Sequence, residues 1–420
     1  MFEKIFPFRL YLHIFQLENY EISRWWRWWY KNPWKRSVEG KKKLVWTGKA
    51  LTISTAAIML GIGATVWWGW MVGIVLILQP GIALTLVATA MRPFENIYWY
   101  TKKLKTRKRI DELKKRGLKV IGITGSYGKT TVKEFLYQIL ATEFKVARSG
   151  ENYNTVPGIV AMVDLELTER YKFFICEMGA HKRGDIRELC EIVDPDFGIV
   201  TGINEQHIER FGSIENTIKT KWELGDYILN KGGWVVANWG NKLLKNKSQT
   251  LSGVSGYGEN ETDSVKQNLA GATLAAGKLG VKNKEIGLIV PEHRLKVIER
   301  GDLTIIDNAY SSNPDGFIAA IEYMKKFEGM RIVITPGIVE LGKYTGEVHR
   351  RLGPKLAEAD YVFLVGKNER TRILEESLKK GKYEFIDRVS EWGNKLEVVK
   401  KVTGWKKIVL LFENDLTDNY

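Results

Sequence analysis

Hydrophobic residues follow two patterns along the chain, and the first is a long apolar stretch near the N-terminus. Residues 50–91 contain no Asp, Glu, Lys or Arg. Because one membrane-spanning helix needs about 20 apolar residues, this stretch is long enough for two spans and a tight turn. Trp67, Trp68 and Trp70 surround Gly69 near its middle, and tryptophan favours the membrane interface. We therefore predict a two-helix transmembrane hairpin at residues 50–91, and a buried helical hairpin of a globular protein is the alternative.

The second pattern, after residue 116, alternates short apolar runs with stretches of helical periodicity. The apolar runs predict buried strands at residues 120–123, 173–176, 198–201, 234–237, 303–307, 331–335, 361–365 and 407–412. Residues 241–262 are polar and weakly patterned, which predicts a loop. Apolar strands separated by helices are typical of a mainly parallel sheet covered on both faces, so we predict an α/β fold. A second strand–helix series begins near Pro291, which divides this part into a central domain (117–291) and a C-terminal Rossmann-like domain (292–420).

The net charge of +15 is concentrated on both sides of the apolar stretch. Residues 1–49 combine basic and aromatic residues, and residues 92–116 form a basic segment that we interpret as a linker. Positive charge at both ends of a hairpin predicts that both ends face the cytoplasm, which places the domains on the cytoplasmic side of the cytoplasmic membrane. A basic excess also occurs in nucleic-acid-binding proteins, but its position here indicates membrane lipid as the partner and no nucleic acid. The N-terminal aromatic residues are predicted to lie at the lipid headgroups; alternatively, they pack against the hairpin or a partner protein.

A candidate phosphate-binding loop at residues 122–131 (GITGSYGKTT) lies between the first predicted strand and an amphipathic helix. Glycines allow backbone N–H groups to surround phosphates at the positive end of a helix. Lys129 is expected to reach the terminal phosphates, and Thr130 is expected to hold Mg²⁺. The strict pattern has a glycine where this chain has Ile123, so the loop is a variant. The residues predicted to bind ATP here are Gly125, Ser126, Gly128, Lys129, Thr130 and Thr131.

Further motifs follow the phosphate loop, and together with it they resemble, in the same order, those of the Mur ligase family, which builds the peptide of the bacterial cell wall. The similar blocks are residues 124–130, 150–158, 177–179, 204–207, 221–223, 307–314 and 340–342, with His349. The Tyr310-x-x-Asn313-Pro314 and Glu340-Leu341-Gly342 elements are most similar to those of the members that add D-alanyl-D-alanine to a muramoyl tripeptide.

The resemblance implies a carboxylate–amine ligase that uses ATP and Mg²⁺. ATP phosphorylates the substrate carboxylate, and the amine then attacks the acyl phosphate. Thr130 and Glu177 would bind one Mg²⁺ and His207 a second. Lys221 matches the lysine that the family carbamoylates, a modification that turns a cation into a metal ligand. The residues with an implied catalytic role are Lys129, His207, Lys221 and Asn313.

The resemblance also assigns residues near the nucleotide and the acceptor. The implied ATP contacts outside the loop are Asn268 at the adenine, Arg294 at the terminal phosphate and Asp307 at the ribose. Asn313 and Tyr310 would lie in the cleft between the domains, near the incoming amine. We interpret His293 and His349 as structural residues.

The chain departs from the family pattern at its N-terminus, where residues 1–116 replace the domain that binds the uridine nucleotide of the substrate. We hypothesise that membrane tethering takes over this role, with a nucleotide- or lipid-linked muropeptide as donor and D-alanyl-D-alanine or another amine as acceptor. Asn308 stands where the most similar members often carry a second aspartate. The open alternatives are a ligase for a different amino acid or wall polymer, a non-catalytic membrane scaffold, and a phosphate-loop kinase or transporter ATPase.

Overall fold

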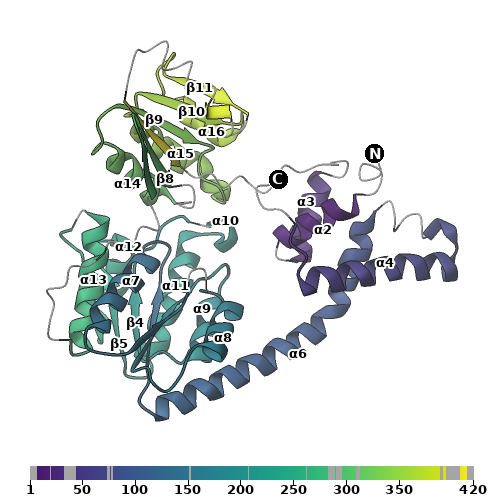
Figure 1. Cartoon of the computed structure of the whole chain (residues 1–420), viewed down its shortest axis with the longest axis horizontal. Coiled ribbons are helices and arrows are strands. Elements are labelled where there is room, and N and C mark those ends of the chain that lie inside the picture. Colours follow the sequence, from purple (N-terminus) through teal and green to yellow (C-terminus); the bar gives the residue numbers. More distant parts are fainter. Residues whose placement is uncertain are drawn as a thin grey trace. The chain divides into compact units, whose positions relative to one another are not determined.

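The chain folds into two compact units, Met1–Thr101 with Thr417–Tyr420 and Lys102–Leu416 (Figure 1). The computed structural model describes residues 7–18, 20–32, 44–72, 76, 79–150, 153–206, 208–261, 263–281, 289, 296–308, 313–387, 391–393 and 407–413. The first unit is helical, and the second holds two β-sheets with their covering helices.

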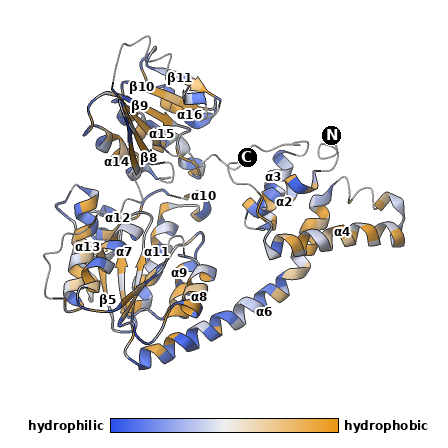
Figure 2. Cartoon of the chain, viewed as in Figure 1, coloured by the Kyte–Doolittle hydropathy of each residue, from blue (hydrophilic) through white to orange (hydrophobic). Residues whose placement is uncertain are grey.

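The first unit contains α2 (Phe8–Leu17), α3 (Ile22–Lys31), α4 (Gly48–Trp68) and the beginning of α6 (Pro80–Lys115). The side chain of Thr47 caps the start of α4 by accepting a hydrogen bond from the Ala50 amide at 3.2 Å. With 21 residues, and a mean hydropathy of 1.7 over an 18-residue window, α4 is the one helix in the described part of the chain that has the length and composition to cross a membrane. Figure 2 shows apolar residues along α4 and mainly polar residues along the later part of α6. The second span of the predicted hairpin stays a prediction.

The aromatic residues of α2 and α3 pack within the first unit. Tyr11, Phe15 and Trp25 are buried in one core with Ile53 of α4 and Leu84 of α6. Trp25 also donates a hydrogen bond from its indole nitrogen to the Tyr11 carbonyl at 3.3 Å. For these residues the structure corresponds to the alternative interpretation, because the N-terminal aromatic residues pack against α4 and the beginning of α6.

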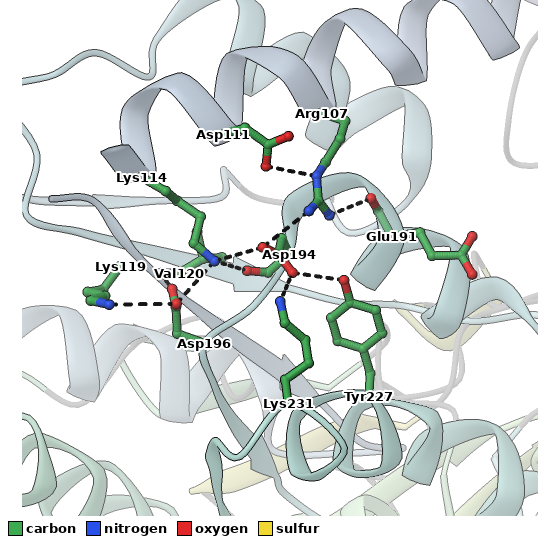
Figure 3. Close-up of polar contacts among 10 residues, drawn as sticks. All are labelled: Arg107, Asp111, Lys114, Lys119, Val120, Glu191, Asp194, Asp196, Tyr227 and Lys231. Carbon is green, nitrogen blue, oxygen red and sulfur yellow. Dashed lines mark hydrogen bonds and ion pairs between the residues drawn. The ribbon is translucent and has the colours of Figure 1, made fainter. Parts of the chain in front are cut away.

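The later part of α6 is an integral piece of the second unit. Ile110 and Leu113 are buried in the core of the central domain. On the same side of the helix, Arg107 and Lys114 form ion pairs with Asp194 at 3.2 and 3.0 Å (Figure 3). The predicted basic linker is therefore helical, and its second half is fixed to the domain by apolar packing and buried charge.

The central domain is built on a six-stranded sheet in which all strands are parallel. In spatial order the strands are β2 (Val146–Arg148), β3 (Phe173–Glu177), β1 (Lys119–Thr124), β4 (Phe197–Val200), β5 (Trp234–Asn238) and β6 (Val254–Tyr257). The helices are α7 (Lys129–Ala141), α8 (Val156–Leu165), α9 (Asp185–Val193), α10 (Ile208–Phe211), α11 (Ile214–Leu229), α12 (Lys242–Ser248) and α13 (Ser264–Lys278).

Two hydrophobic cores cover the two faces of this sheet. Ile121 and Ile123 of β1 point into a core that includes α7 and α13. Val120, which alternates with them, points into the core formed with α8, α9 and α11. Both faces of the strand are apolar for this reason, as the continuous hydrophobic run indicated.

The C-terminal domain has a second six-stranded sheet, parallel except for the antiparallel pair β7 and β8. Its spatial order is β11 (Tyr383–Ile386), β10 (Tyr361–Val365), β9 (Met330–Thr335), β12 (Ile408–Glu413), β8 (Leu303–Asn308) and β7 (Lys296–Arg300). The remaining elements are α14 (Pro314–Met324), the 3₁₀ helix η1 (Gly342–Tyr344), α15 (Thr345–Leu356) and α16 (Glu369–Glu375).

All eight predicted strands are confirmed, and the predicted α/β fold with them. The prediction of a loop at residues 241–262 was wrong, because this segment contains α12 and β6. Of the four strands that the hydrophobic pattern did not indicate, β2 and β6 are the edges of the first sheet, and β7 and β11 are the edges of the second. Edge strands have only one paired neighbour and need no continuous apolar run.

Candidate active site

The phosphate loop connects the end of β1 to the start of α7, and its glycines are required by its backbone. Gly128 caps the helix in the left-handed region, with a φ of 82°. Gly125 has a φ of 151°, and a Cβ atom there would lie 2.2 Å from the Thr201 hydroxyl. The Ser126 amide donates a hydrogen bond to the Gly202 carbonyl at 2.6 Å. The loop is thus held against the end of β4, in front of a helix N-terminus that can bind an anion.

Lys129 is the first residue of α7 and folds back over the loop. Its ammonium group donates hydrogen bonds to the carbonyls of Gly125 and Ser126, at 2.8 and 3.2 Å. The cation therefore lies over the backbone that is expected to surround phosphates. Thr130 and Thr131 follow on the first turn of the helix, and both are half-buried.

Glu177 is brought next to the phosphate loop by the register of the sheet, in which it lies opposite Ile123 of β1. The Thr130 hydroxyl donates a hydrogen bond to Oε2 of Glu177 at 3.1 Å. Burial acts to raise the pKa of Glu177, but the positive charges of Lys129 and Lys133 outweigh it, so this pKa is lowered and the carboxylate is ionised. A hydroxyl and a carboxylate side by side are hard oxygen ligands, so these residues fit a Mg²⁺ ion.

Of the other two predicted metal ligands, His207 and Lys221, the structure describes only Lys221. His207 lies outside the described residues. Within the ranges that the structure describes, no three His, Cys, Asp or Glu side chains form a metal-binding group. Lys221 is buried on α11, and its pKa is lowered to about 7 by burial and then by the charge of Lys129. Near neutral pH, a large fraction of this amine therefore carries no charge.

The predicted nucleotide contacts outside the loop are partly described. Asn268 of α13 is buried, and its side-chain oxygen would be 2.6 Å from a Cβ atom at Gly128, which places it against the phosphate loop. Asp307 is exposed near the end of β8, in register with Phe412 of β12. The structure places Asn268 next to the loop, and the role of Asp307 at the ribose stays a prediction. Arg294, His293 and Tyr310 lie outside the described residues.

Asn313 caps α14, because its side-chain oxygen accepts a hydrogen bond from the Gly316 amide at 2.8 Å. The same oxygen accepts a second hydrogen bond, from the amide nitrogen of Asn204 at 3.1 Å. Asn204 follows β4 of the central domain and also donates to Asp315 at 2.8 Å. Asn313 therefore fixes the first turn of α14 and connects it to the central domain.

His349 has a structural environment, as predicted. It is fully buried on α15, and its Nε2 accepts a hydrogen bond from the Ile338 amide at 3.0 Å. Its Nδ1 lies 2.7 Å from the Thr345 carbonyl and must carry the proton of that hydrogen bond. Burial lowers the pKa of His349 to about 4, so the imidazole is neutral at physiological pH.

Three residues that organise the site, namely Lys133, Ser149 and Asn204, had no role assigned from the sequence, although Asn204 lies in one of the blocks that resemble the family. Lys133 is fully buried, and its ammonium group lies 3.2 Å from Oε2 of Glu177. Ser149 accepts a hydrogen bond from the Glu177 amide at 3.0 Å. One signal was available for Lys133, because it lies one helical turn after Lys129 beside an otherwise apolar face.

Comparison with known proteins gives two family matches and a set of relatives. The family models are the Mur ligase middle domain, over residues 123–293, and the Mur ligase glutamate ligase domain, over residues 293–412. The UDP-N-acetylmuramoyl-tripeptide–D-alanyl-D-alanine ligase of Bacillus subtilis is 28% identical over 329 residues, which cover 69% of this chain and 71% of that protein.

Solved structures show the same fold. The crystal structure of MurF from Acinetobacter baumannii is 22% identical with a TM-score of 0.67, and the similarity covers 76% of this chain and 78% of that one. The MurF ligase from Thermotoga maritima in complex with ADP is 23% identical with a TM-score of 0.64, covering 75% of this chain and 80% of that one.

Proposed function

Because the chain belongs to the Mur ligase family, we propose that it uses ATP to join D-alanyl-D-alanine to a muramoyl tripeptide. The two matched family models together span residues 123–412. The observation that carries the proposal is the contact between Thr130 and Glu177 beside Lys129, which brings the phosphate loop together with a carboxylate that could bind a metal. The choice of substrates is supported by the activity for which the Bacillus subtilis relative is named.

The proposed reaction has two steps. A carboxylate oxygen of the tripeptide attacks the γ-phosphorus of ATP, which forms an acyl phosphate and releases ADP. The amine of the dipeptide then attacks the acyl carbon, and the amide forms as phosphate leaves. Lys129 and the N-terminus of α7 would bind the phosphates and stabilise the negative charge that develops on the transferring group.

A bound Mg²⁺ would neutralise phosphate charge, and Thr130 and Glu177 are the described residues that would hold it. His207 is proposed as a ligand of a second Mg²⁺. We propose that Lys221 is carbamoylated, because its neutral amine can react with carbon dioxide, and the product would place an anion near Lys129. The unmodified ammonium group would repel both a metal ion and Lys129.

The chain is further proposed to work at the inner face of the cytoplasmic membrane. The support for this is α4, on which Ile58, Met59, Ile62 and Val66 are all more than half exposed although they are apolar. An exposed apolar surface of this kind is costly in water and stable in lipid. Membrane tethering would bring the ligase to a muropeptide donor that is attached to a lipid or about to receive one.

The proposal is tested by measuring phosphate release from the full chain in detergent with ATP and Mg²⁺. The donor is UDP-muramoyl tripeptide or its lipid-linked form, each with and without D-alanyl-D-alanine, and Lys129→Ala is the control. We expect release that requires both donor and dipeptide and disappears in the variant. Release with another amine in place of the dipeptide would favour a different acceptor, and ATP hydrolysis that ignores the acceptor would contradict the ligase assignment.

A further inference from the structure

Lys133 is a charged residue buried in the centre of the candidate active site, with 1% of its side chain exposed. We propose that it is a positioning residue, which holds the carboxylate of Glu177 in place for the Mg²⁺ ion of the ATP complex. The inference rests on the proposed function, because it assumes that Glu177 binds the metal.

Two hydrogen bonds and an ion pair fix Lys133 and Glu177 relative to each other. The Lys133 ammonium group donates to the Ser149 carbonyl at 3.0 Å and lies 3.2 Å from Oε2 of Glu177. The Ser149 hydroxyl in turn accepts from the Glu177 amide at 3.0 Å. Lys133 therefore holds the glutamate both at its carboxylate and, through Ser149, at its backbone.

Two side chains contact the same oxygen of the carboxylate. Thr130 donates a hydrogen bond to Oε2 of Glu177, and Lys133 forms an ion pair with the same oxygen. In our proposal the other oxygen, Oε1, is the ligand of the metal. A carboxylate held through one oxygen keeps a fixed orientation, and its second oxygen stays available as a ligand of the metal.

A purely structural role would not require this charge. Burying an ammonium group is unfavourable unless it is paired, and a buried ion pair can often be replaced by apolar residues without loss of stability. Lys133 lies beside the apolar face of α7, where Val132, Phe135 and Leu136 fill the core. A methionine could fill the same space, so the cation is explained better by its partner Glu177 than by packing.

The test measures how strongly Mg²⁺ increases the affinity of the full chain for a nucleotide. A fluorescent, non-hydrolysable ATP analogue is titrated into the detergent-solubilised protein in EDTA and in Mg²⁺, and the ratio of the two dissociation constants is the Mg²⁺ effect. In Lys133→Met we expect this ratio to fall by about tenfold, within the usual range of coupling between two sites. Lys133→Arg should retain most of it, because arginine keeps the charge.

Two comparisons separate positioning from loss of structure. Lys145→Met removes an exposed lysine near β2 and should leave the ratio unchanged. In a Glu177→Gln background, Lys133→Met should cause no further loss, because its effect acts through the carboxylate. If Lys133→Met does not fold, Lys133→Gln replaces it; glutamine keeps a hydrogen-bond donor for the Ser149 carbonyl but lacks the charge.

The outcomes distinguish this inference from the proposed function. The positioning role would be overturned if a folded Lys133→Met or Lys133→Gln variant kept the full Mg²⁺ effect on nucleotide affinity. It would also be overturned if Lys133→Met reduced the Mg²⁺ effect equally in the wild-type and Glu177→Gln backgrounds. A wild-type chain that shows no Mg²⁺ effect on nucleotide binding would overturn the metal-dependent ATP site itself, and the inference with it.

Discussion

At the scale of single residues, His349 is a buried polar side chain that is fixed by backbone groups. His349 takes both of its partners from the backbone, accepting from Ile338 and donating to Thr345. The imidazole is therefore stable only in its neutral form, because a proton on Nε2 would face the Ile338 amide. This arrangement makes the stability of the C-terminal domain sensitive to acid.

We expect the C-terminal domain to lose about 2 kcal/mol of stability between pH 7 and pH 5 through His349. The pKa of this histidine is about 4 in the folded chain and about 6.5 when unfolded. Between these values the unfolded state binds more protons, so stability falls as the pH falls. Native-state hydrogen exchange of peptides from α15 measures this loss. A His349→Gln variant should lack the pH-dependent component, and an equal pH dependence in that variant would contradict the prediction.

At the scale of elements, the later part of α6 belongs to the central domain, although its basic sequence predicted only a linker. Asp194 lies at the C-terminal end of α9 with a left-handed φ of 49°. Figure 3 shows Arg107 and Lys114 of α6 and Tyr227 and Lys231 converging on it. Burial acts to raise the pKa of Asp194, but hydrogen bonds from Lys231, Lys114 and Tyr227 hold it well below its usual value.

Replacing Asp194 by asparagine should loosen α6 from the central domain. Asparagine tolerates the left-handed backbone, so the change removes charge without adding strain. Because it leaves the partly buried cations Arg107 and Lys114 without their charged partner, we expect a loss of about 2 kcal/mol in stability. Hydrogen exchange of residues 103–115 should increase in the same variant.

The matched control is Asp111→Asn, which removes another partner of Arg107. Asp111 is half exposed and pairs with Arg107 within the helix, at 2.9 Å. A surface pair of this kind contributes about 0.5 kcal/mol. Equal effects of the two substitutions would show that the ion pairs at Asp194 do not hold the helix in place.

At the scale of the whole molecule, the chain joins a ligase to an N-terminal unit rich in exposed apolar residues. Ile58 and Ile62 on α4 are 52% and 61% exposed. If the helix lies in lipid, these side chains contact hydrocarbon, and a lysine at either position would be unfavourable by about 3 kcal/mol.

We expect the variant Ile58→Lys/Ile62→Lys to be extracted from membranes by alkaline carbonate, whereas the wild-type chain resists extraction. Leu165→Lys is the control, because Leu165 is 82% exposed at the end of α8 in the ligase part. The control should stay with the membrane. Resistance to extraction in the double variant would argue against an anchor at α4.

The same variant tests whether tethering replaces a uridine-binding domain. Loss of the anchor should reduce turnover of a donor presented in vesicles, since the ligase would no longer be concentrated at their surface. If the soluble nucleotide-linked donor, too, is turned over equally well with and without the anchor, tethering is not a substitute for donor binding.

Much of the fold could be predicted because central parallel strands are apolar on both faces. The runs at β1, β3 and β12 are continuous for this reason, and each was assigned within one residue of its ends. The four missed strands are sheet edges, where one side lacks a paired neighbour and the hydrophobic signal is interrupted. The phosphate loop could be recognised because its function depends on residues that are consecutive in the sequence.

The sequence by itself determined the strand–helix alternation, the phosphate loop and the family resemblance, since each depends on local order along the chain. The tertiary structure alone decided which distant residues meet. The register of β1 and β3 brings Glu177 to Thr130, and the packing of α7 brings Lys133 to the same carboxylate. It also decided that α6 packs on the central domain, because the partner of its basic residues, Asp194, is some 80 residues away along the chain. Contacts of this kind depend on burial and charge in three dimensions, which no local pattern records.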